Sequence, residues 1–421
     1  MSKFTFIDLF AGIGGFHQAM KSLGGKCVFV CENDEQCVET YKKNYDVKEI
    51  YGNIRNINPI KDVPNFDCLC AGFPCQSFSK AGLRKGFKDE QRGDLFDYII
   101  KILKDHQEAK FIILENVRNL ADDEDNWKHI QEELMKLNFF ITEEPIILSP
   151  SDFGIPQVRE RVYILGIRKD LRDIEKLKNG YIHISDLHLE KQMKKCGSKA
   201  ALSILDNKKG NISTLTDEQV EMLGAWEEFR IQCLTESIGS PIWLHYFGTD
   251  FEDDKSFYRS CGFYKNKKNR TPEWKQRFIT RNRELYKKNK EWIDEWIVRY
   301  DMKNRSRIYQ KFEWNCRGKC ETMHDGIIQF RQSGIRVKAP NSFPSLVAMV
   351  NTPIIWDTEI EEFRYITVEE AAKLQSFKSD FDFGESKHTA YKQLGNSVNV
   401  KVLKILGKAL TNLLIEDWEE K

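Results

Sequence analysis

The sequence has no long apolar run and no cysteine framework, and these absences exclude several classes of protein. No window approaches the roughly 20 uncharged apolar residues that a membrane-spanning helix needs. The first residues do not show a basic segment followed by an apolar run and small residues, so no secretion signal is found. Eleven cysteines, an odd number, do not suit a disulfide framework. We therefore expect a cytoplasmic protein with reduced thiols and no membrane partner.

Metal-ligand spacing is also scarce. Cys316 and Cys320 are followed by His324, but no second cysteine pair with the spacing of a structural zinc site accompanies them. We expect no bound metal.

The charge is unevenly distributed, although its sum is close to zero. The 421 residues are 41% hydrophobic and 31% charged and carry a net charge of +1, which is ordinary for a globular chain. The segment 255–311, however, holds 18 Lys/Arg against 6 Asp/Glu, so it carries +12 and the remainder −11, and it also contains 11 aromatics. Basic residues interleaved with aromatics suit nucleic acid. The alternative is a solvated helix surface over an aromatic core, and Trp292, Trp296 and Tyr300 recur at that helical spacing.

The first 170 residues alternate β-like runs with amphipathic helical patterns, which is typical of parallel strands joined by crossover helices. The pattern predicts a doubly wound α/β sheet. Expected strands are 4–10, 26–32, 66–72, 110–116 and 162–167. Expected helices lie near 14–23, 34–45, 94–106 and 126–138. After Asp170, polar lysine-rich segments indicate a linker or the entry to a second domain, and 391–414 is expected to be a loop leading into an apolar helix.

A glycine-rich turn, 10-FAGIGGF-16, follows the first expected strand and opens a helix. Glycines at such a turn let the backbone approach a ligand, although the spacing is not the full dinucleotide fingerprint. Glu32 ends the second strand, where an acidic side chain accepts hydrogen bonds from ribose hydroxyls in such folds. Together they indicate a nucleoside-containing cofactor. A tight turn with an unrelated surface glutamate remains the alternative.

One cysteine lies in the loop 72-GFPCQSFSKAG-82, directly after a strand. In open α/β sheets, ligands bind outside the carboxyl ends of the strands, so Cys75 is expected to face the cofactor crevice. Cys68 and Cys70 lie within the strand and are interpreted as structural. A small buried hydrophobe is the alternative for Cys75 as well.

Two further features carry charge to strand ends. Glu115 in 113-ILENV-117 ends a strand, and a buried carboxyl there has a raised pKa and can hold or deliver a proton. Arg159 and Arg161 in 157-QVRERVYIL-165 alternate, so they point to the same side, where paired guanidiniums suit phosphate or an electron-rich heteroatom. A pair bonded to local carboxylates is the other interpretation.

The ordered set FAGIGG, GFPCQ, ENV, QVRER and GNSVNV resembles the DNA (cytosine-5)-methyltransferase family of bacterial restriction-modification systems. The resemblance covers about the first 170 and the last 60 residues and leaves the middle as a variable target-recognition region. It implies a Rossmann-like sheet that binds S-adenosyl-L-methionine and releases S-adenosyl-L-homocysteine. It also implies that the enzyme methylates C5 of a flipped-out cytosine in double-stranded DNA.

The resemblance assigns catalytic roles to four residues. Cys75 would be the nucleophile that adds to cytosine C6, because this addition makes C5 reactive toward the methyl donor. Glu115 would hydrogen bond or protonate ring N3, and Arg161 would steady the base oxygen with the help of Arg159. The target base must first leave the stack.

The resemblance also implies binding residues. Those expected to contact the cofactor are Phe10, Ala11, Gly12, Ile13, Gly15, Glu32, Asn33, Asn53, Ile54, Pro74, Gln76, Leu95, Asn396 and Ser397. Those expected near DNA are Ser79, Lys80 and Arg84 on the loop after Cys75, and Arg331, Gln332 and Ser333 in the middle region. Asn53 departs from the family, which usually has an aspartate there, but an amide still offers a carbonyl oxygen to the adenine amino group. Arg364, near the start of a late motif, is expected to be an internal anchor.

The implied organisation has three parts. Residues 1–175 form a catalytic and cofactor-binding domain, 176–385 a smaller target-recognition domain, and 386–421 a segment that returns to the catalytic domain. The chain is expected to act as a monomer near the bacterial nucleoid, and no direct contact with a companion restriction endonuclease is implied. Alternatives are a tRNA methyltransferase of the same family, a nicotinamide oxidoreductase on a similar sheet, and a noncatalytic DNA-binding protein.

Overall fold

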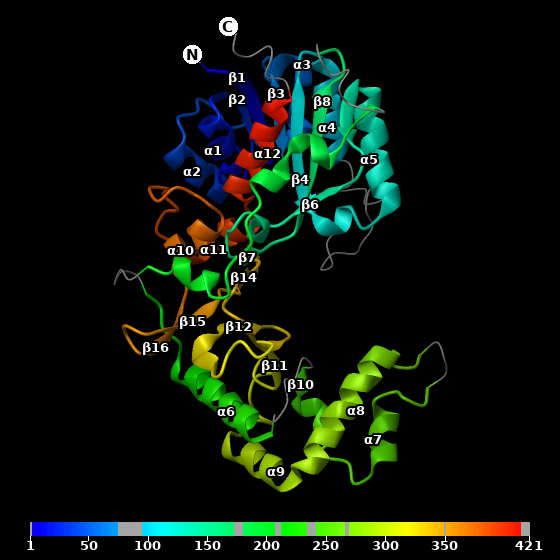
Figure 1. The fold of residues 1–421 in the computed structure, drawn as a ribbon, viewed down its shortest axis with the longest axis vertical. Helices are drawn as coiled ribbons and strands as arrows, with labels where there is room; N and C mark the ends of the chain where they lie inside the picture. The colour runs from blue at the N-terminus through cyan, green and yellow to red at the C-terminus, as the bar shows by residue number, and fades with distance from the viewer. Residues whose placement is uncertain are drawn as a thin grey trace. The chain divides into compact units, whose positions relative to one another are not determined.

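A computed structural model describes residues 2–74, 95–171, 180–206, 212–233, 241–265, 269–348 and 351–413. The chain forms two compact units. Unit 1 comprises 1–204, 344–350 and 368–421, and unit 2 comprises 205–343 and 351–367. Each unit is described by itself below (Figure 1).

Unit 1 is built on a sheet that contains eight strands within the described residues. The strands are β1 (Phe4–Leu9), β2 (Gly25–Cys31), β3 (Cys68–Ala71), β4 (Phe111–Val117), β5 (Phe139–Thr142), β6 (Ile146–Leu148), β8 (Arg161–Arg168) and β9 (Tyr181–Ile182). Their order is β2-β1-β3-β4-β8-β5-β9, with β6 also paired to β8. The first four strands are parallel, whereas β8 runs antiparallel to β4. All five predicted strands are present, and the reversal of β8 is a difference from the expected parallel pattern.

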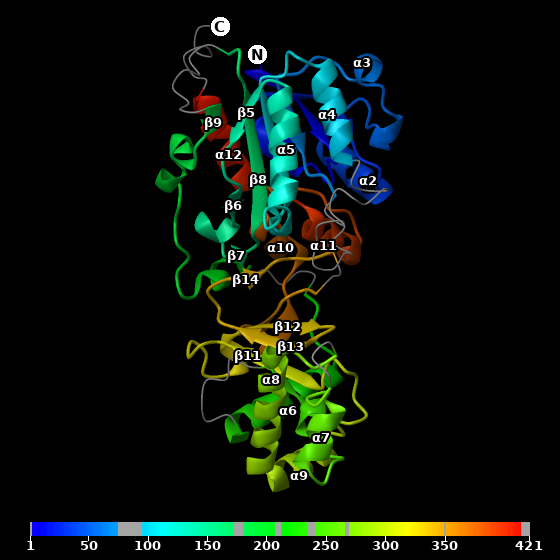
Figure 2. The same cartoon turned by 90° about the vertical axis from the view of Figure 1, so that its right-hand side faces the viewer.

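Helices cover both faces of this sheet, as the prediction of a doubly wound fold requires (Figure 2). The helices of unit 1 are α1 (Gly15–Ser22), α2 (Glu35–Asn44), α3 (Pro59–Asp62), α4 (Leu95–Asp105), α5 (Glu124–Lys136), α10 (Val368–Leu374), α11 (Lys387–Asn396) and α12 (Val400–Asn412). A short two-residue strand, β7 (Gln157–Val158), precedes β8, and β14 (Phe343–Pro344) lies where the chain passes between the units. Helices α1 and α12 pack together on one face of the sheet, and α4 and α5 lie on the other.

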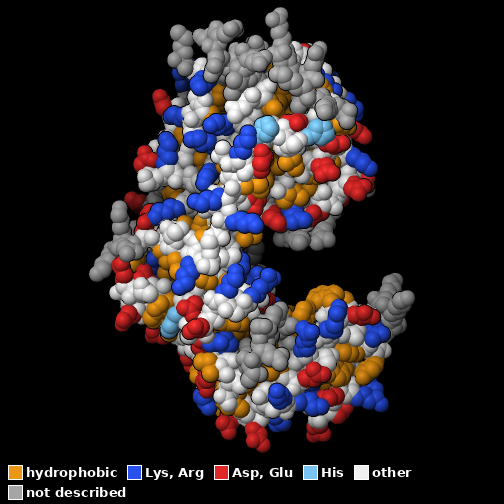
Figure 3. Space-filling view, viewed as in Figure 1, with side chains coloured by type: hydrophobic (Ala, Val, Ile, Leu, Met, Phe, Trp, Pro, Cys, Tyr) orange, Lys and Arg blue, Asp and Glu red, His pale blue; other side chains and the backbone are white. Residues whose placement is uncertain are grey.

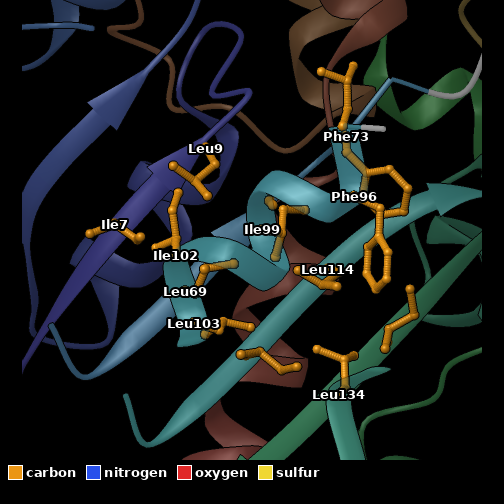
Figure 4. Close-up of a cluster of buried hydrophobic side chains, with 14 of the residues drawn as sticks. Ile7, Leu9, Leu69, Phe73, Phe96, Ile99, Ile102, Leu103, Leu114 and Leu134 are labelled. Carbon is orange, nitrogen blue, oxygen red and sulfur yellow. The ribbon is translucent and has the colours of Figure 1, made fainter. Parts of the chain in front are cut away.

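The core beneath α4 and α5 follows directly from the alternation of side chains in the strands. Leu9, Leu69 and Leu114 come from three neighbouring strands and point to the same face, where Ile99 and Ile102 of α4 meet them (Figure 4). All five side chains are fully buried. This packing fixes the strand ends that carry the candidate site.

The chain reverses its direction of sheet growth at β1. It adds β2 on one side of β1 and then returns to add β3 on the other. Ligands of doubly wound folds bind at such a switch point, outside the carboxyl ends of the two strands. The turn after Leu9 and the turn after Ala71 therefore meet at the expected binding edge.

Unit 2 has its own sheet, in which six strands are ordered β10-β11-β13-β12-β15-β16 within the described residues. The strands are β10 (Ile242–Trp243), β11 (Lys311–Asn315), β12 (Ile327–Arg331), β13 (Gly334–Lys338), β15 (Ile354–Asp357) and β16 (Glu362–Tyr365). The helices are α6 (Asp217–Cys233), α7 (Asp254–Ser260), α8 (Glu273–Lys288) and α9 (Lys290–Arg299). Adjacent strands are antiparallel except for β11 and β13, which are parallel.

Aromatic side chains form the core of unit 2. Trp226 of α6 stacks on Phe312 of β11 with ring centroids 5.1 Å apart, and Trp296 meets the same Trp226 at 5.0 Å. Trp296 is fully buried, and Trp292 and Tyr300 are partly buried against the same cluster, so the core interpretation of these residues is confirmed. Trp292 and Trp296 lie on α9 and Tyr300 is its C-cap, while the preceding helix α8 ends at Lys288.

The units divide at residues other than those predicted. The predicted boundaries are 175 and 385. In the structure, unit 1 continues to Ile204 and also includes residues 344–350 and the chain from Val368 onward. The early return has a packing reason, since α10 is largely buried and Gln375 beyond it donates to Leu394 O of α11 at 2.9 Å. The expected loop at 391 is also wrong, since α11 extends to Asn396. The roles assigned to the two units remain predictions.

Two further predictions from the sequence concern a bound metal and a membrane-spanning helix. Within the described ranges, no three His, Cys, Asp or Glu side chains are grouped as metal ligands. Cys316 and Cys320 are buried, and the ring of His324 stacks on Trp356 at 4.0 Å. Across the same ranges, no helix is both long and apolar enough to cross a bilayer.

Candidate active site

The turn after β1 has an unusual backbone. Phe10 has φ 54°, Gly12 has φ 54° and Gly14 has φ 83°. A positive φ is costly for a residue with a side chain, and such strain gathers at functional sites. Ala11 N donates to Cys31 O at 3.1 Å, which ties the turn to the end of β2. Gly14 is the N-cap of α1, so the positive end of the helix dipole lies at this turn.

Glu32 holds this turn in place. Its Oε2 accepts from Gly12 N at 2.7 Å, and its Oε1 accepts from Asn33 N and Asp34 N, both at 2.8 Å. Burial raises the pKa of Glu32, and the three backbone donors oppose that effect. Each carboxylate oxygen has two lone pairs. Glu32 can therefore accept a ligand hydroxyl as well.

Asn53 lies on the segment that runs beside the end of β2. Glu32 N donates to Tyr51 O at 2.8 Å, which places this segment next to Glu32. The side-chain oxygen of Asn53 accepts from Arg55 N at 3.0 Å and caps the short 3-10 helix Ile54–Asn56. One lone pair of that oxygen remains for a ligand.

Two pockets open at this edge of unit 1 and share Phe10 as a lining residue. Of the residues predicted to bind cofactor, the first is lined by Phe10, Ala11, Gly12, Ile13, Gly15, Asn396 and Ser397. The second is lined by Phe10, Glu32, Asn33, Asn53, Ile54, Pro74 and Leu95. Segments far apart in the sequence are thus brought together as the binding prediction requires. Gln76 lies outside the described residues.

Glu115 lines the first pocket from the end of β4. Its Oε1 lies 3.0 Å from Arg161 Nε, and the side chains are 10% and 18% exposed. Burial raises the pKa of Glu115, while the charges of Arg161 and then Arg159 lower it, and the net direction is upward. A proton is therefore held more readily at this carboxyl than at an ordinary glutamate.

Arg159 has a different set of partners from Arg161. Its Nη1 donates to Leu346 O at 2.8 Å and Ser345 Oγ at 3.1 Å, and its Nη2 donates to Ser397 O at 2.7 Å and Gly395 O at 3.0 Å. The guanidinium thus joins segments that are almost 190 and 240 residues away in the chain. The two arginines do not form one ligand-facing pair, although both act electrostatically on Glu115.

Four further predicted site residues lie outside the described residues: Cys75, Ser79, Lys80 and Arg84. Pro74, the residue before Cys75, lines the second pocket, and Phe73 O accepts from Asn116 Nδ2 at 3.3 Å. Phe73, two residues before Cys75 in the sequence, therefore contacts Asn116, the residue that follows Glu115.

The three DNA candidates of the middle region belong to unit 2. Arg331 ends β12 and is partly buried, and the next two residues, Gln332 and Ser333, are exposed in the turn to β13.

Sequence reasoning missed several lining residues. Phe16, Cys37, Gly72, Gln393 and Val398 line the first pocket, and Cys31, Gly52 and Arg55 line the second. Gln393 had a detectable signal, because it lies one helical turn before Asn396 and so shares its helix face. Cys37 had none, since its place depends on how α2 packs against the glycine-rich turn.

This arrangement is that of a Rossmann-like methyltransferase, in which a doubly wound sheet presents its glycine-rich turn and strand-end carboxylates at the switch point. The chain belongs to the family of C-5 cytosine-specific DNA methylases, which residues 4–412 match. The predicted family and fold are confirmed.

Three relatives illustrate the likeness. Type II methyltransferase M.AluI of Cellulosimicrobium cellulans is 30% identical, over 96% of this chain and 91% of its own. Type II methyltransferase M.HpaII of Haemophilus parainfluenzae is 48% identical, but over 40% of this chain and 47% of its own. Among solved structures, a Spodoptera frugiperda DNMT2 mutant covers 97% of this chain and 99% of its own, with a TM-score of 0.55 and 18% identity. The last comparison bears on the fold alone.

Proposed function

We propose that this chain is the methyltransferase of a type II restriction-modification system. It would transfer a methyl group from S-adenosyl-L-methionine to C5 of a flipped-out cytosine in duplex DNA. The observation that carries the proposal is the buried carboxyl of Glu115, which lines the first pocket and is paired with Arg161, in a chain of this family.

The residues at this edge suit the methyl donor. Glu32 and Asn53 would accept from its ribose and adenine groups, and the apolar side chains of Phe10, Ile54 and Leu95 would flank the purine ring. A Cβ built on Gly12 would meet nothing within 4 Å, so open space lies beside this backbone. The donor supplies an electrophilic methyl group and leaves as S-adenosyl-L-homocysteine.

Cys75 would act on the base. Its thiolate adds to cytosine C6 and forms a carbon–sulfur bond, while ring N3 receives a proton. The resulting electron-rich C5 takes the methyl group. Water would then accept the C5 proton, the C6–sulfur bond would break to regenerate the Cys75 thiolate, and the proton on N3 would return to the carboxylate that supplied it.

Glu115 suits the proton transfer at N3, because burial raises the pKa of its carboxyl above that of an ordinary glutamate and so lets it hold a proton more readily. Arg161, 3.0 Å away, would hold the carboxyl in place and donate to the base oxygen. Arg159 would support the same pocket indirectly, through its hydrogen bonds to the segments around Leu346 and Ser397. The cytosine must be extruded to reach these groups.

The experiment is methyl transfer by a Cys75→Ala protein. The variant is expected to bind duplex DNA and S-adenosylhomocysteine like the wild type, but to transfer no labelled methyl group, because the ring is no longer activated. A duplex with 5-fluorocytosine at the methylated position should become covalently attached to the wild type alone. Full turnover by the variant would overturn the proposal.

A further inference from the structure

The sheet of unit 2 has one apolar and one charged face. Phe312, Ile335 and Phe330 lie side by side on the adjacent strands β11, β13 and β12 and pack in or against the aromatic core. Because side chains alternate, Glu313, Arg336 and their neighbours point to the opposite face. Glu313 is directly opposite Arg336 in the register of β11 and β13.

Glu313 is shared by three cations. Arg336 Nε donates to its Oε2 at 2.7 Å, Lys311 Nζ lies 2.9 Å from its Oε1, and Arg331 Nη2 lies 2.9 Å from its Oε2. The side chains of Glu313, Lys311 and Arg331 are 10%, 13% and 17% exposed, so most of the group is shielded from water, while Arg336 is 32% exposed. Three cations against one carboxylate leave an excess of +2, which is costly in such surroundings.

The three cations are not held equally. Lys311 also lies over the ring of Trp243, with Nζ 4.5 Å from the centroid, and Arg336 has a well-formed hydrogen bond. Arg331 is held most weakly: its Nη2 lies close to Glu313 Oε2 but without the geometry of a hydrogen bond, and its buried Nε has no hydrogen-bond partner among the described residues. If Arg331 turns toward an incoming anion, Glu313 keeps two partners. Arg331 is thus the exchangeable member of the group.

We propose that this face of unit 2 holds a backbone phosphate of duplex DNA, with Arg331 as the contact residue and Glu313 as the positioning residue. The inference rests on the proposed function, because it takes DNA as the ligand. A phosphate carries the negative charge that the group lacks, and it accepts guanidinium hydrogen bonds at both oxygens. A guanine edge is neutral and would leave the excess charge in place.

The test compares variants of the full-length protein on two duplexes, one with the methylated site found by bisulfite sequencing and one without it. Fluorescence anisotropy gives the affinity at several salt concentrations. Arg331→Ala should bind both duplexes about tenfold more weakly. The negative slope of log affinity against log salt should become less steep by about 0.9, which corresponds to the loss of one phosphate contact.

Two further variants make the result specific. Arg331→Lys should restore most of the affinity and the slope, because a phosphate accepts a point charge where a bidentate base contact would not. Arg299→Ala is the matched control: it removes an exposed arginine of the same unit that pairs with Glu228, and it should bind like the wild type.

Three outcomes would overturn the inference. One is wild-type binding and slope for Arg331→Ala. Another is a loss confined to the site-containing duplex, or a changed methylation site, which would indicate base reading. The third is a loss that Arg331→Lys does not restore. Failure of the proposed function is recognised separately, as absence of methyl transfer by the wild type.

Discussion

Glu115 and Asp8 are two buried carboxyl groups of the same sheet, and their surroundings differ in whether the proton of the carboxyl can be exchanged with a ligand. Glu115 faces a pocket and has Arg161 beside it, so its proton can be exchanged with a ligand. Asp8 is completely buried within β1, and its Oδ1 has no hydrogen-bond partner among the described residues. Tyr41 Oη donates to the other oxygen at 3.3 Å. A carboxyl group in such a place is stable mainly as the neutral acid.

The neutral state of Asp8 gives a prediction for stability against pH. Burial raises the pKa of Asp8 well above its ordinary value, so the folded protein keeps a proton that the unfolded chain releases above about pH 4. The stabilisation is complete below the unfolded pKa and is lost as pH rises toward the folded pKa. Between about pH 5 and pH 8, wild type should therefore lose stability relative to Asp8→Asn, as measured by urea unfolding.

Asp67→Asn is the matched control for this experiment. Although burial raises the pKa of Asp67, hydrogen bonds from Lys110 and Thr5 leave it lowered overall. Asp67 is therefore ionised in both the folded and the unfolded protein above about pH 5. The difference in free energy of unfolding between wild type and Asp67→Asn should stay flat between about pH 5 and pH 8. A flat difference for Asp8→Asn as well would show that Asp8 is ionised in the folded protein.

At the scale of elements, Gly12 and Gly14 of the glycine-rich turn both have a positive φ, but they differ in how closely other side chains pack against them. Gly14 is the N-cap of α1, and its carbonyl oxygen accepts from Tyr45 Oη at 2.8 Å. A Cβ on Gly14 would lie 2.3 Å from a ring carbon of Tyr45 and 3.0 Å from Tyr41. A Cβ on Gly12 would meet nothing.

This contrast predicts unequal costs for two alanine substitutions. Gly14→Ala should lower the free energy of unfolding by about 2–4 kcal/mol, because it adds overpacking to an unfavourable φ. Gly12→Ala should cost about 1 kcal/mol, from the backbone conformation alone. Denaturant unfolding without cofactor measures both. Equal losses would mean that Tyr45 moves aside without cost.

Hydrophobic periodicity predicted the presence of β1 to β4, β8 and the helices around them, because each buries one face or one stripe. It could not predict that β8 runs antiparallel, since alternation in a strand carries no direction. The helical spacing of Trp292, Trp296 and Tyr300 was recognised, but that spacing alone gives no bounds, and the structure places the start of their helix at Lys290.

At the site, motif residues were predictable and their partners were not. Glu32 and Glu115 were found because they end strands. The cap that Asn53 gives to Arg55 N and the hydrogen bonds of Arg159 depend on segments that pack together only in the folded chain. The ion pairs of unit 2 also required the structure.

At the scale of the whole molecule, the excess of basic residues in 255–311 is partly neutralised. Arg283 and Lys287 both pair with Asp254, while Arg305 pairs with Glu218 and Glu221. The exposed aromatics Tyr264 and Trp274 are each followed by a lysine in the sequence. Lys and Arg side chains adjoin apolar ones over α7 and α8 (Figure 3). The positive charge that remains is thus local to part of unit 2.

The two units have separate cores, which predicts separate unfolding transitions. Seven tryptophans belong to unit 2, whereas Trp127 is the one in the described part of unit 1. Tryptophan fluorescence therefore reports mainly on unit 2, and far-ultraviolet circular dichroism on both. S-adenosylhomocysteine contacts unit 1 in the proposed function, and at about 100 times its Kd it should stabilise that unit by about 2.7 kcal/mol.

The ligand should accordingly raise the Tm of a circular dichroism transition and leave the fluorescence transition unchanged. Units with little shared core need not unfold together, because cooperativity follows the packing of each core. Cys75→Ala serves as the control, since it should show the same shift while lacking activity. A single transition in both signals that moves with the ligand would mean that the units unfold as one, and that a ligand of unit 1 also stabilises unit 2.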